Sequence, residues 1–330
     1  MVGSGPAGLS CASYLARLGY DVTIYEKKEK AGGLDTYGMA EYKMPQRVSL
    51  SEVERIAGMG VKFVLNTRVG QESHSPSELA AEIAEPIQNP KSKIQNQDVS
   101  FSDLEEWHDA IFLGVGLGDT NRLNIPGEDS EGVYDALHFI ERIKTRDWMS
   151  VPLGKTVAVI GAGNTAIDAV TQAKRLGAEK VVMIYRRTEA DASAYDYEME
   201  LARKDGVEFV WQAAPVGILA GENGSRLTLR CEKTDGSLTL FDLPCDIVIK
   251  SVGQLKLRWF FENVASVNVD DKGRVVVNEN MQTSNPKIFS GGDCANGGAE
   301  AVDAAQMGKL AAQGIHFAIS GETVKFAGNI

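Results

Sequence analysis

Short apolar runs alternate with amphipathic segments at the start of the chain, in the order of a βαβ unit. The pattern predicts a helix over residues 6–18, ended by Gly19, and a strand over residues 21–25. Only Met1 and Val2 precede the first glycine turn, whereas a buried strand usually supplies about five residues. We therefore expect the chain to begin inside the first strand of this unit.

The same order of elements returns from Thr156. The apolar run Val157–Ile160 predicts a buried strand, and the next segment predicts a helix that ends near residues 176–177. A further apolar run predicts a strand over residues 181–185. The chain thus contains two units of one α/β type, followed by a strand at residues 288–290 and a helix over about residues 300–315.

Three other segments carry weaker signals. The polar residues 86–98 contain a short repeat and predict an inserted surface loop. The mixed-charge residues 195–205 predict a solvated helix face. Residues 124–129 and the stretch after Gly253 are candidate hinges between domains.

Composition excludes several classes of protein. The net charge of −11 argues against nucleic-acid binding, and no apolar run is long enough to span a membrane. The chain start has no secretion signal, so we expect a cytoplasmic protein. The 4 cysteines lie far apart and the 4 histidines show no metal spacing, so we expect neither an iron–sulfur cluster nor a metal site in this chain.

The first glycine turn has the spacing of a dinucleotide-binding motif. Its expected cofactor-binding residues are Gly3, Gly5, Pro6, Ala7 and Gly8. Such glycines allow a tight turn and leave the N–H groups of a helix N-terminus free for a pyrophosphate. Glu26 follows the second strand and is placed to accept a hydrogen bond from a ribose hydroxyl.

The second glycine turn contains Gly161, Gly163 and, at the third position of the motif, Ala166. Where a site for NAD carries an acid, this chain has Arg186 and Arg187, whose guanidinium groups suit the 2′-phosphate of NADP. The alternative is a solvated surface pair of arginines. NADP(H) is therefore the preferred coenzyme, and NAD(H) remains possible.

A third motif, Gly292–Asp293, follows the apolar strand at residues 288–290. The Asp293 carboxylate is expected to face a hydroxyl of a flavin cofactor. The next helix, with Val302 in its first turn, is expected to direct its positive N-terminus at the flavin ring.

These motifs, together with residues 32–45, occur in an order that resembles the glutamate synthase small-subunit family of FAD- and NAD(P)H-dependent oxidoreductases. Within that family the chain looks most similar to the flavin subunit of bacterial NAD-dependent dihydropyrimidine dehydrogenase. The resemblance covers nearly the whole chain. It implies that Gly33, Leu34 and Lys43 approach the flavin, that Asn164 and Thr165 hold the nicotinamide dinucleotide, and that Gly253 lies beside it.

The resemblance also implies a fold of two Rossmann-like domains, as in flavoproteins of the glutathione and thioredoxin reductase type. The FAD-binding domain would comprise residues 1–120 and 284–330, with the NAD(P)H-binding domain, residues 121–283, inserted in it. In this family an iron–sulfur domain precedes the point at which this chain starts, so we expect that domain to be absent here.

Hydride transfer between two bound cofactors needs alignment rather than a nucleophile, so no catalytic side chain is expected. The predicted function is the input of electrons from NAD(P)H through FAD to a partner subunit or an iron–sulfur protein. One alternative is a disulfide reductase of the thioredoxin reductase type, for which no cysteine pair is suitably spaced. Another is a truncated, non-catalytic nucleotide-binding subunit.

Overall fold

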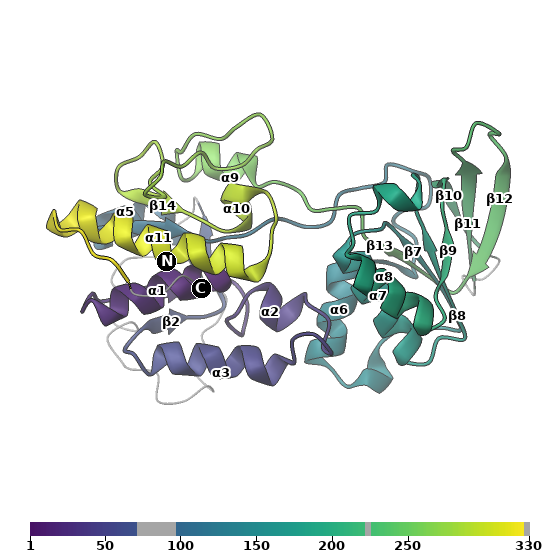
Figure 1. Ribbon diagram of the computed structural model, residues 1–330, viewed down its shortest axis with the longest axis horizontal. Coiled ribbons are helices and arrows are strands. Elements are labelled where there is room, and N and C mark those ends of the chain that lie inside the picture. Colours follow the sequence, from purple (N-terminus) through teal and green to yellow (C-terminus); the bar gives the residue numbers. More distant parts are fainter. Residues whose placement is uncertain (71–96, 222–225, 327–330) are drawn as a thin grey trace. The chain divides into compact units, whose positions relative to one another are not determined.

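The computed structural model describes residues 1–70, 97–221 and 226–326 of the 330-residue chain (Figure 1). The predicted polar loop lies almost entirely outside these residues. Its last two positions, 97 and 98, begin strand β4 (Gln97–Ser100).

The chain folds into two compact units. The first comprises residues 1–36, 46–118 and 256–330, and the second comprises residues 37–45 and 119–255. Two features differ from the expected division: the second unit ends at residue 255 rather than 283, and it includes the short segment 37–45. Of the two candidate hinges, the stretch after Gly253 coincides with a boundary between units, whereas residues 124–129 lie inside the second unit.

Parallel strands build the sheet of the first unit. Strand β1 (Thr23–Tyr25) pairs with β2 (Lys62–Val64), and β5 (Ile111–Leu113) pairs with β14 (Ile288–Ser290). Val2 bridges Tyr25 and Leu113, so the short first strand occupies the centre of the sheet. The first glycine turn therefore leaves the sheet at its middle, at the carboxyl end of the strand.

Helices cover this sheet on one face. Residues Ile24, Phe63, Phe112 and Phe289 pack with apolar residues of α1 (Pro6–Arg17) and α11 (Ala301–Ser320) into one buried cluster. The alternate residues of the same strands point to the opposite face and form a second cluster. The other elements of this unit are α3 (Gln46–Ala57), β3 (Thr67–Gly70), β4, α5 (Phe101–Trp107), α9 (Arg258–Asn263) and α10 (Asp293–Asn296). Helix α2 (Leu34–Tyr37) spans the boundary between the units.

The second unit contains a five-stranded parallel sheet in the order β6-β13-β7-β8-β9. Its strands are β6 (Val133–Asp135), β13 (Ile247–Lys250), β7 (Thr156–Ile160), β8 (Lys180–Ile184) and β9 (Glu208–Val210). From β7 the chain continues to β8 on one side, while β13 lies on the other side. The second glycine turn thus follows the strand at which the order reverses, which is where open α/β sheets bind ligands.

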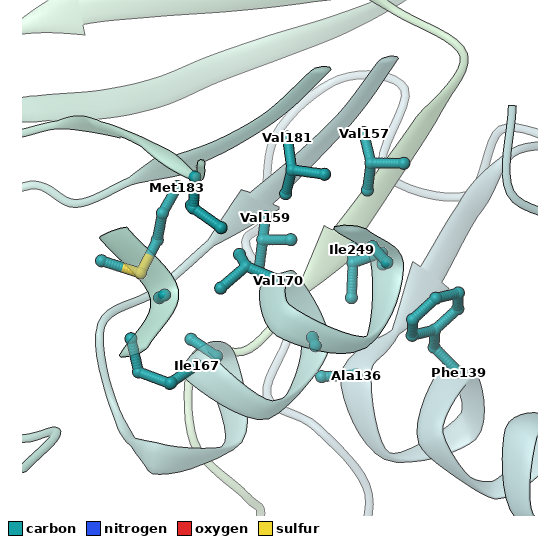
Figure 2. Packing of buried hydrophobic residues seen from close by; sticks show 14 of the residues in the cluster. Ala136, Phe139, Val157, Val159, Ile167, Val170, Val181, Met183 and Ile249 are labelled. Carbon is teal, nitrogen blue, oxygen red and sulfur yellow. The ribbon is translucent and has the colours of Figure 1, made fainter. Parts of the chain in front are cut away.

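Three layers make up this unit. Val157, Val159, Val181, Met183 and Ile249 face helices and form a buried core with Ala136, Phe139, Ile167 and Val170, as Figure 2 shows. The helices are α6 (Ala136–Thr145), α7 (Asn164–Arg175) and α8 (Asp196–Lys204), and the short turns η1 (Trp148–Ser150) and η2 (Glu189–Asp191) connect elements. The opposite face packs on an antiparallel sheet of β10 (Ala213–Ala220), β11 (Leu227–Lys233) and β12 (Leu240–Cys245).

The two βαβ units predicted from the periodicity are confirmed to within about two residues at each end. Helix α8 buries Glu198, Met199 and Ala202, and the burial of the charged Glu198 departs from the predicted solvated face. The Glu198 carboxylate pairs with Lys43 within the second unit.

Candidate dinucleotide-binding sites

The first glycine turn requires glycine at two positions for different reasons. Gly3 has a φ of 93°, and a Cβ there would lie 2.5 Å from the carbonyl oxygen of Gly114. A Cβ on Gly8 would lie 2.2 Å from the carbonyl oxygen of Gly3. At Gly5, by contrast, a Cβ would meet no atom within 4 Å, so the turn is open at this residue.

This open turn suits an anionic group. Helix α1 begins at Pro6 with Gly5 as its N-cap, and no acidic residue lies in its first turn. The first N–H groups of an α-helix have no partner inside the helix and carry its positive dipole end. The structure thus brings Gly3, Gly5, Pro6, Ala7 and Gly8 together as a turn that fits a pyrophosphate, as an FAD site requires.

Glu26 lies at the end of β1, next to this turn. Its carboxylate accepts hydrogen bonds from Ser4 N at 3.0 Å, Ser4 Oγ at 2.5 Å and Lys28 N at 2.9 Å. The side chain is therefore held in one orientation beside the turn. A carboxylate accepts about four hydrogen bonds, so capacity for a ribose hydroxyl remains.

Gly33 and Leu34 also lie beside the first turn. Gly33 has a φ of 57°, and a Cβ there would be 2.7 Å from the Cα of Gly5. Leu34 begins α2 and is 39% exposed. The backbone of Gly33 therefore lies against the first turn, and the contact of Gly33 and Leu34 with a flavin stays a prediction.

Lys43 belongs to the second unit. Its ammonium lies 2.5 Å from Asp168 Oδ1 and 2.7 Å from Glu198 Oε1, and both carboxylates are buried. Burial lowers the pKa of Lys43, but the two carboxylates outweigh that effect and raise it. The structure therefore gives Lys43 a pairing role that the sequence did not indicate, and its expected approach to the flavin remains untested.

The third motif, Gly292–Asp293, lies beside the first glycine turn. Gly292 has a φ of 75°, and a Cβ there would lie 3.0 Å from the Cβ of Ala7. Asp293 starts the short helix α10, which the sequence did not predict, and accepts a hydrogen bond from Ala299 N at 3.3 Å. Burial raises the pKa of Asp293. Val302 lies in the first turn of α11 and is 59% exposed.

Gly308 is a glycine of this site that sequence reasoning missed. A Cβ there would lie 2.2 Å from the carbonyl oxygen of Ala7, so glycine permits α11 to pack closely against α1. Glycine in a helix interior costs stability. Its presence mid-helix was the signal that a neighbouring backbone approaches.

The second turn repeats this geometry. Gly161 has a φ of 129°, and a Cβ there would lie 2.1 Å from the carbonyl oxygen of Ser251. Gly163 is the N-cap of α7, whose first residues are Asn164, Thr165 and the fully buried Ala166. The Asn164 side chain accepts a hydrogen bond from Tyr195 N at 3.1 Å, which ties α7 to the loop before α8.

A cavity of about 540 Å³ opens at the second turn. Its walls include Gly161, Gly163, Thr165, Gly253 and the end of β8 at Arg186 and Arg187. Neither guanidinium is in an ion pair within the part of the chain that the structure describes, and both residues are exposed. Sequence analysis missed a third arginine in the lining, Arg122, because its loop carries no motif.

The charge of this cavity is one-sided. Three arginines line it, and none of the described residues in its wall is acidic. Arg122 pairs with Asp129 behind the wall at 2.6 Å, so among the described residues the unpaired positive charge comes from Arg186 and Arg187. This contrasts with the net charge of −11 of the whole chain. The arrangement favours a polyanionic ligand.

Cysteine and metal chemistry find no support in the described residues. Cys11, Cys231, Cys245 and Cys294 are all free and buried. Burial raises the pKa of Cys231 to about 12 and that of Cys245 to about 11, so neither is a reactive thiolate. Over the same residues, no group of side chains is arranged to hold a metal ion, and no helix is long and apolar enough to cross a membrane.

The pyridine nucleotide-disulphide oxidoreductase family matches residues 1–308, and the chain belongs to that family. It is an NAD(P)H-dependent flavoprotein oxidoreductase.

Two curated relatives illustrate the breadth of the family. The chain is 34% identical to the NADPH glutamate synthase small chain of Escherichia coli K12, over 96% of this chain and 67% of that protein. It is 32% identical to the NADP⁺-dependent formate dehydrogenase subunit beta of Moorella thermoacetica, over 96% of this chain and 43% of that subunit. The resemblance to glutamate synthase small subunits is thereby confirmed, whereas the narrower link to dihydropyrimidine dehydrogenase remains a prediction.

Solved structures confirm the expected fold. Thioredoxin reductase of Lactococcus lactis matches with a TM-score of 0.73 at 20% identity, over 97% of this chain and 98% of that chain. Mycobacterium tuberculosis FprA in complex with NADPH matches with a TM-score of 0.66 at 19% identity, over 98% of this chain and 86% of that chain.

Proposed function

We propose that the first unit binds FAD, that the second unit binds NADP(H), and that electrons taken from NADPH leave through the flavin to a partner protein. The open first turn beside Glu26 supports the FAD assignment. The cavity at the second turn supports the nucleotide assignment. The proposal keeps the expected inserted order of the domains, with the boundaries redrawn at residues 118/119 and 255/256.

The preference for NADP(H) rests on one observation. Arg186 and Arg187 follow β8, the strand whose end meets the adenosine ribose in this fold, and they line the cavity with no acidic neighbour in its wall. A 2′-phosphate would receive charge-assisted hydrogen bonds there. An acid at this place would instead bind the 2′-hydroxyl of NAD. Ser193 lies in the same wall and adds no charge.

The chain acts by binding and orientation. Bound FAD supplies the isoalloxazine ring that accepts a hydride. The glycine turns at residues 3–8 and 161–166 hold the two pyrophosphates, while Glu26 and the arginine pair select the riboses. No side chain is required as a nucleophile, and the four buried cysteines give no observation that favours disulfide reduction.

The proposal includes a partner protein that accepts the electrons. The names of the relatives describe a small chain and a subunit beta, and both are subunits of larger enzymes. The chain spans 67% of the first of these proteins and 43% of the second. We propose that this chain is likewise an electron-input subunit, of the glutamate synthase or dihydropyrimidine dehydrogenase type.

Anaerobic stopped-flow spectroscopy of the FAD-loaded chain tests this function. We expect NADPH to bleach the flavin absorbance faster than NADH does. Replacing both Arg186 and Arg187 with Ser is expected to lower kcat/KM for NADPH by about tenfold or more and to leave that for NADH nearly unchanged, because only NADPH carries the 2′-phosphate.

Arg230→Ser is the matched control. Arg230 is exposed on β11, pairs with Asp242 and does not line the cavity, so its loss is expected to change neither rate. Absence of flavin bleaching with both nucleotides would contradict the function itself. An equal loss of kcat/KM for NADPH and NADH in the double variant would contradict only the assigned preference for NADP(H).

A further inference from the structure

A buried ion cluster lies within the second unit beside the cavity residue Arg122, whose guanidinium is 3.7 Å from Glu128 Oε2. Lys250 Nζ lies 3.0 Å from Glu128 Oε1 and 3.3 Å from Asp135 Oδ1. The side chain of Glu128 is 1% exposed, that of Lys250 10% and that of Asp135 22%. A charge as deeply buried as that of Glu128 is tolerated only when it is paired and hydrogen-bonded, so Lys250 is required beside it.

The Glu128 carboxylate also fixes a loop. It accepts hydrogen bonds from Leu123 N and Asn124 N, each at 2.8 Å. Asn124 has a φ of 58°, in the left-handed region that asparagine adopts more readily than other non-glycine residues. The carboxylate and the turn preference of Asn124 therefore together fix the backbone of residues 123–124.

The cluster joins three segments of the cavity wall. Glu128 holds Leu123, which lines the cavity. Asp135 ends β6 directly before Ala136 and Leu137 of the wall, and Lys250 ends β13 directly before Ser251–Gln254 of the wall. One set of buried charges thus sets the relative positions of segments that are more than 100 residues apart in the sequence.

The position of this wall in the sheet assigns it to one half of a dinucleotide. The pyrophosphate belongs at the glycine turn after β7, and the adenosine ribose belongs at the end of β8. Strands β13 and β6 lie on the other side of β7. The nicotinamide half must therefore extend over the ends of β13 and β6.

We propose that Glu128, Lys250 and Asp135 are positioning residues that set the nicotinamide-facing wall of the cavity before the coenzyme binds. This inference rests on the proposed binding of a nicotinamide dinucleotide in the second unit. It assigns to residues 124–129 a role in shaping the site, in place of the hinge that their composition predicts.

Isothermal titration calorimetry on the full chain tests the proposal without any turnover. The probes are NADP⁺ and its adenosine half, 2′,5′-ADP. Glu128→Gln removes the charge but keeps the shape, and we expect it to raise the Kd of NADP⁺ about tenfold while changing that of 2′,5′-ADP less than about twofold. Hydrogen exchange is expected to show loss of protection at the amides of Leu123 and Asn124.

Asp246→Asn is the matched control. Asp246 precedes the opposite end of β13, accepts two backbone N–H bonds at 2.8 Å and pairs with Arg226, but it does not line the cavity. It is expected to lower the thermal stability and to leave both Kd values within about twofold of the wild type. Asp135→Asn keeps the Glu128–Lys250 pair and serves if the Glu128 variant does not fold, with an expected rise of about threefold in the Kd of NADP⁺ alone.

The outcomes separate the two proposals. Wild-type chain that binds neither NADP⁺ nor NAD⁺ would overturn the proposed function. The positioning role is overturned if the wild type binds NADP⁺ and the cluster variants bind it with the same Kd. It is also overturned if the variants lose affinity for NADP⁺ and for 2′,5′-ADP by the same factor. In both cases the proposed function stands.

Discussion

Substitutions at two glycines of the first turn distinguish an effect on FAD affinity from an effect on the stability of the fold. Gly5 has open space around a would-be Cβ and an extended backbone with a φ of −67°, so Gly5→Ala is expected to cost the unliganded fold less than about 1 kcal/mol, the weaker N-cap being partly offset by the lower entropy of the unfolded chain. The added methyl group would occupy the space proposed for the FAD pyrophosphate, and we expect at least about a tenfold weaker FAD affinity.

Gly8→Ala provides the contrast. The new Cβ would lie 2.2 Å from a backbone oxygen, so the turn must shift, and we expect a loss of about 1–3 kcal/mol in the unfolding free energy of the flavin-free chain. Flavin fluorescence titration and urea unfolding measure the two effects. Equal FAD affinity in Gly5→Ala and the wild type would refute the location of the pyrophosphate.

Helix α7 connects the second glycine turn to the core. Ile167 is fully buried between the helix and the sheet, so Ile167→Ala is expected to lower the unfolding free energy by about 2–5 kcal/mol. Ile319→Ala, near the end of α11 at a residue 44% exposed, is the control and is expected to change it by less than about 0.5 kcal/mol. Similar values for the two variants in urea unfolding would show that α7 does not pack as described.

At the scale of the whole molecule, two carboxylates of the second unit with depressed pKa values make stability depend on pH. Burial raises the pKa of Glu128, but bonds from Leu123 N, Lys250 and Asn124 N outweigh it and hold the pKa below the ordinary 4.5. Burial also raises the pKa of Asp246, but hydrogen bonds from the N–H groups of Thr156 and Lys155 outweigh that effect and lower it. Because the folded pKa is depressed, this stability is present above the unfolded pKa and is lost as the pH falls through the folded one.

We therefore expect the melting temperature to fall as the pH is lowered below about 4.5 and to fall less steeply in Glu128→Gln. Differential scanning calorimetry from pH 7 to pH 3 measures this dependence. A variant with the same acid slope as the wild type would mean that the Glu128 carboxylate has no depressed pKa.

Much of the site was predictable because its signals are local. The glycine spacing between a strand and a helix identifies the turns at residues 3–8 and 161–166, and each turn forms within one βαβ unit. Lys43 shows the limit of this reasoning. Its partners Asp168 and Glu198 lie more than 100 residues away, and no spacing rule connects them.

The amino-acid sequence alone determined the two βαβ units, the order of their elements and the positions of the glycine turns, because periodicity and turn chemistry act over a few residues. Tertiary structure decided that residues 37–45 fold with the second unit and residues 256–283 with the first. It also decided that Glu128 is buried against Lys250 and that Arg122 reaches the cavity. These features depend on which distant segments exclude water together, and that becomes fixed only when the sheets and helices pack.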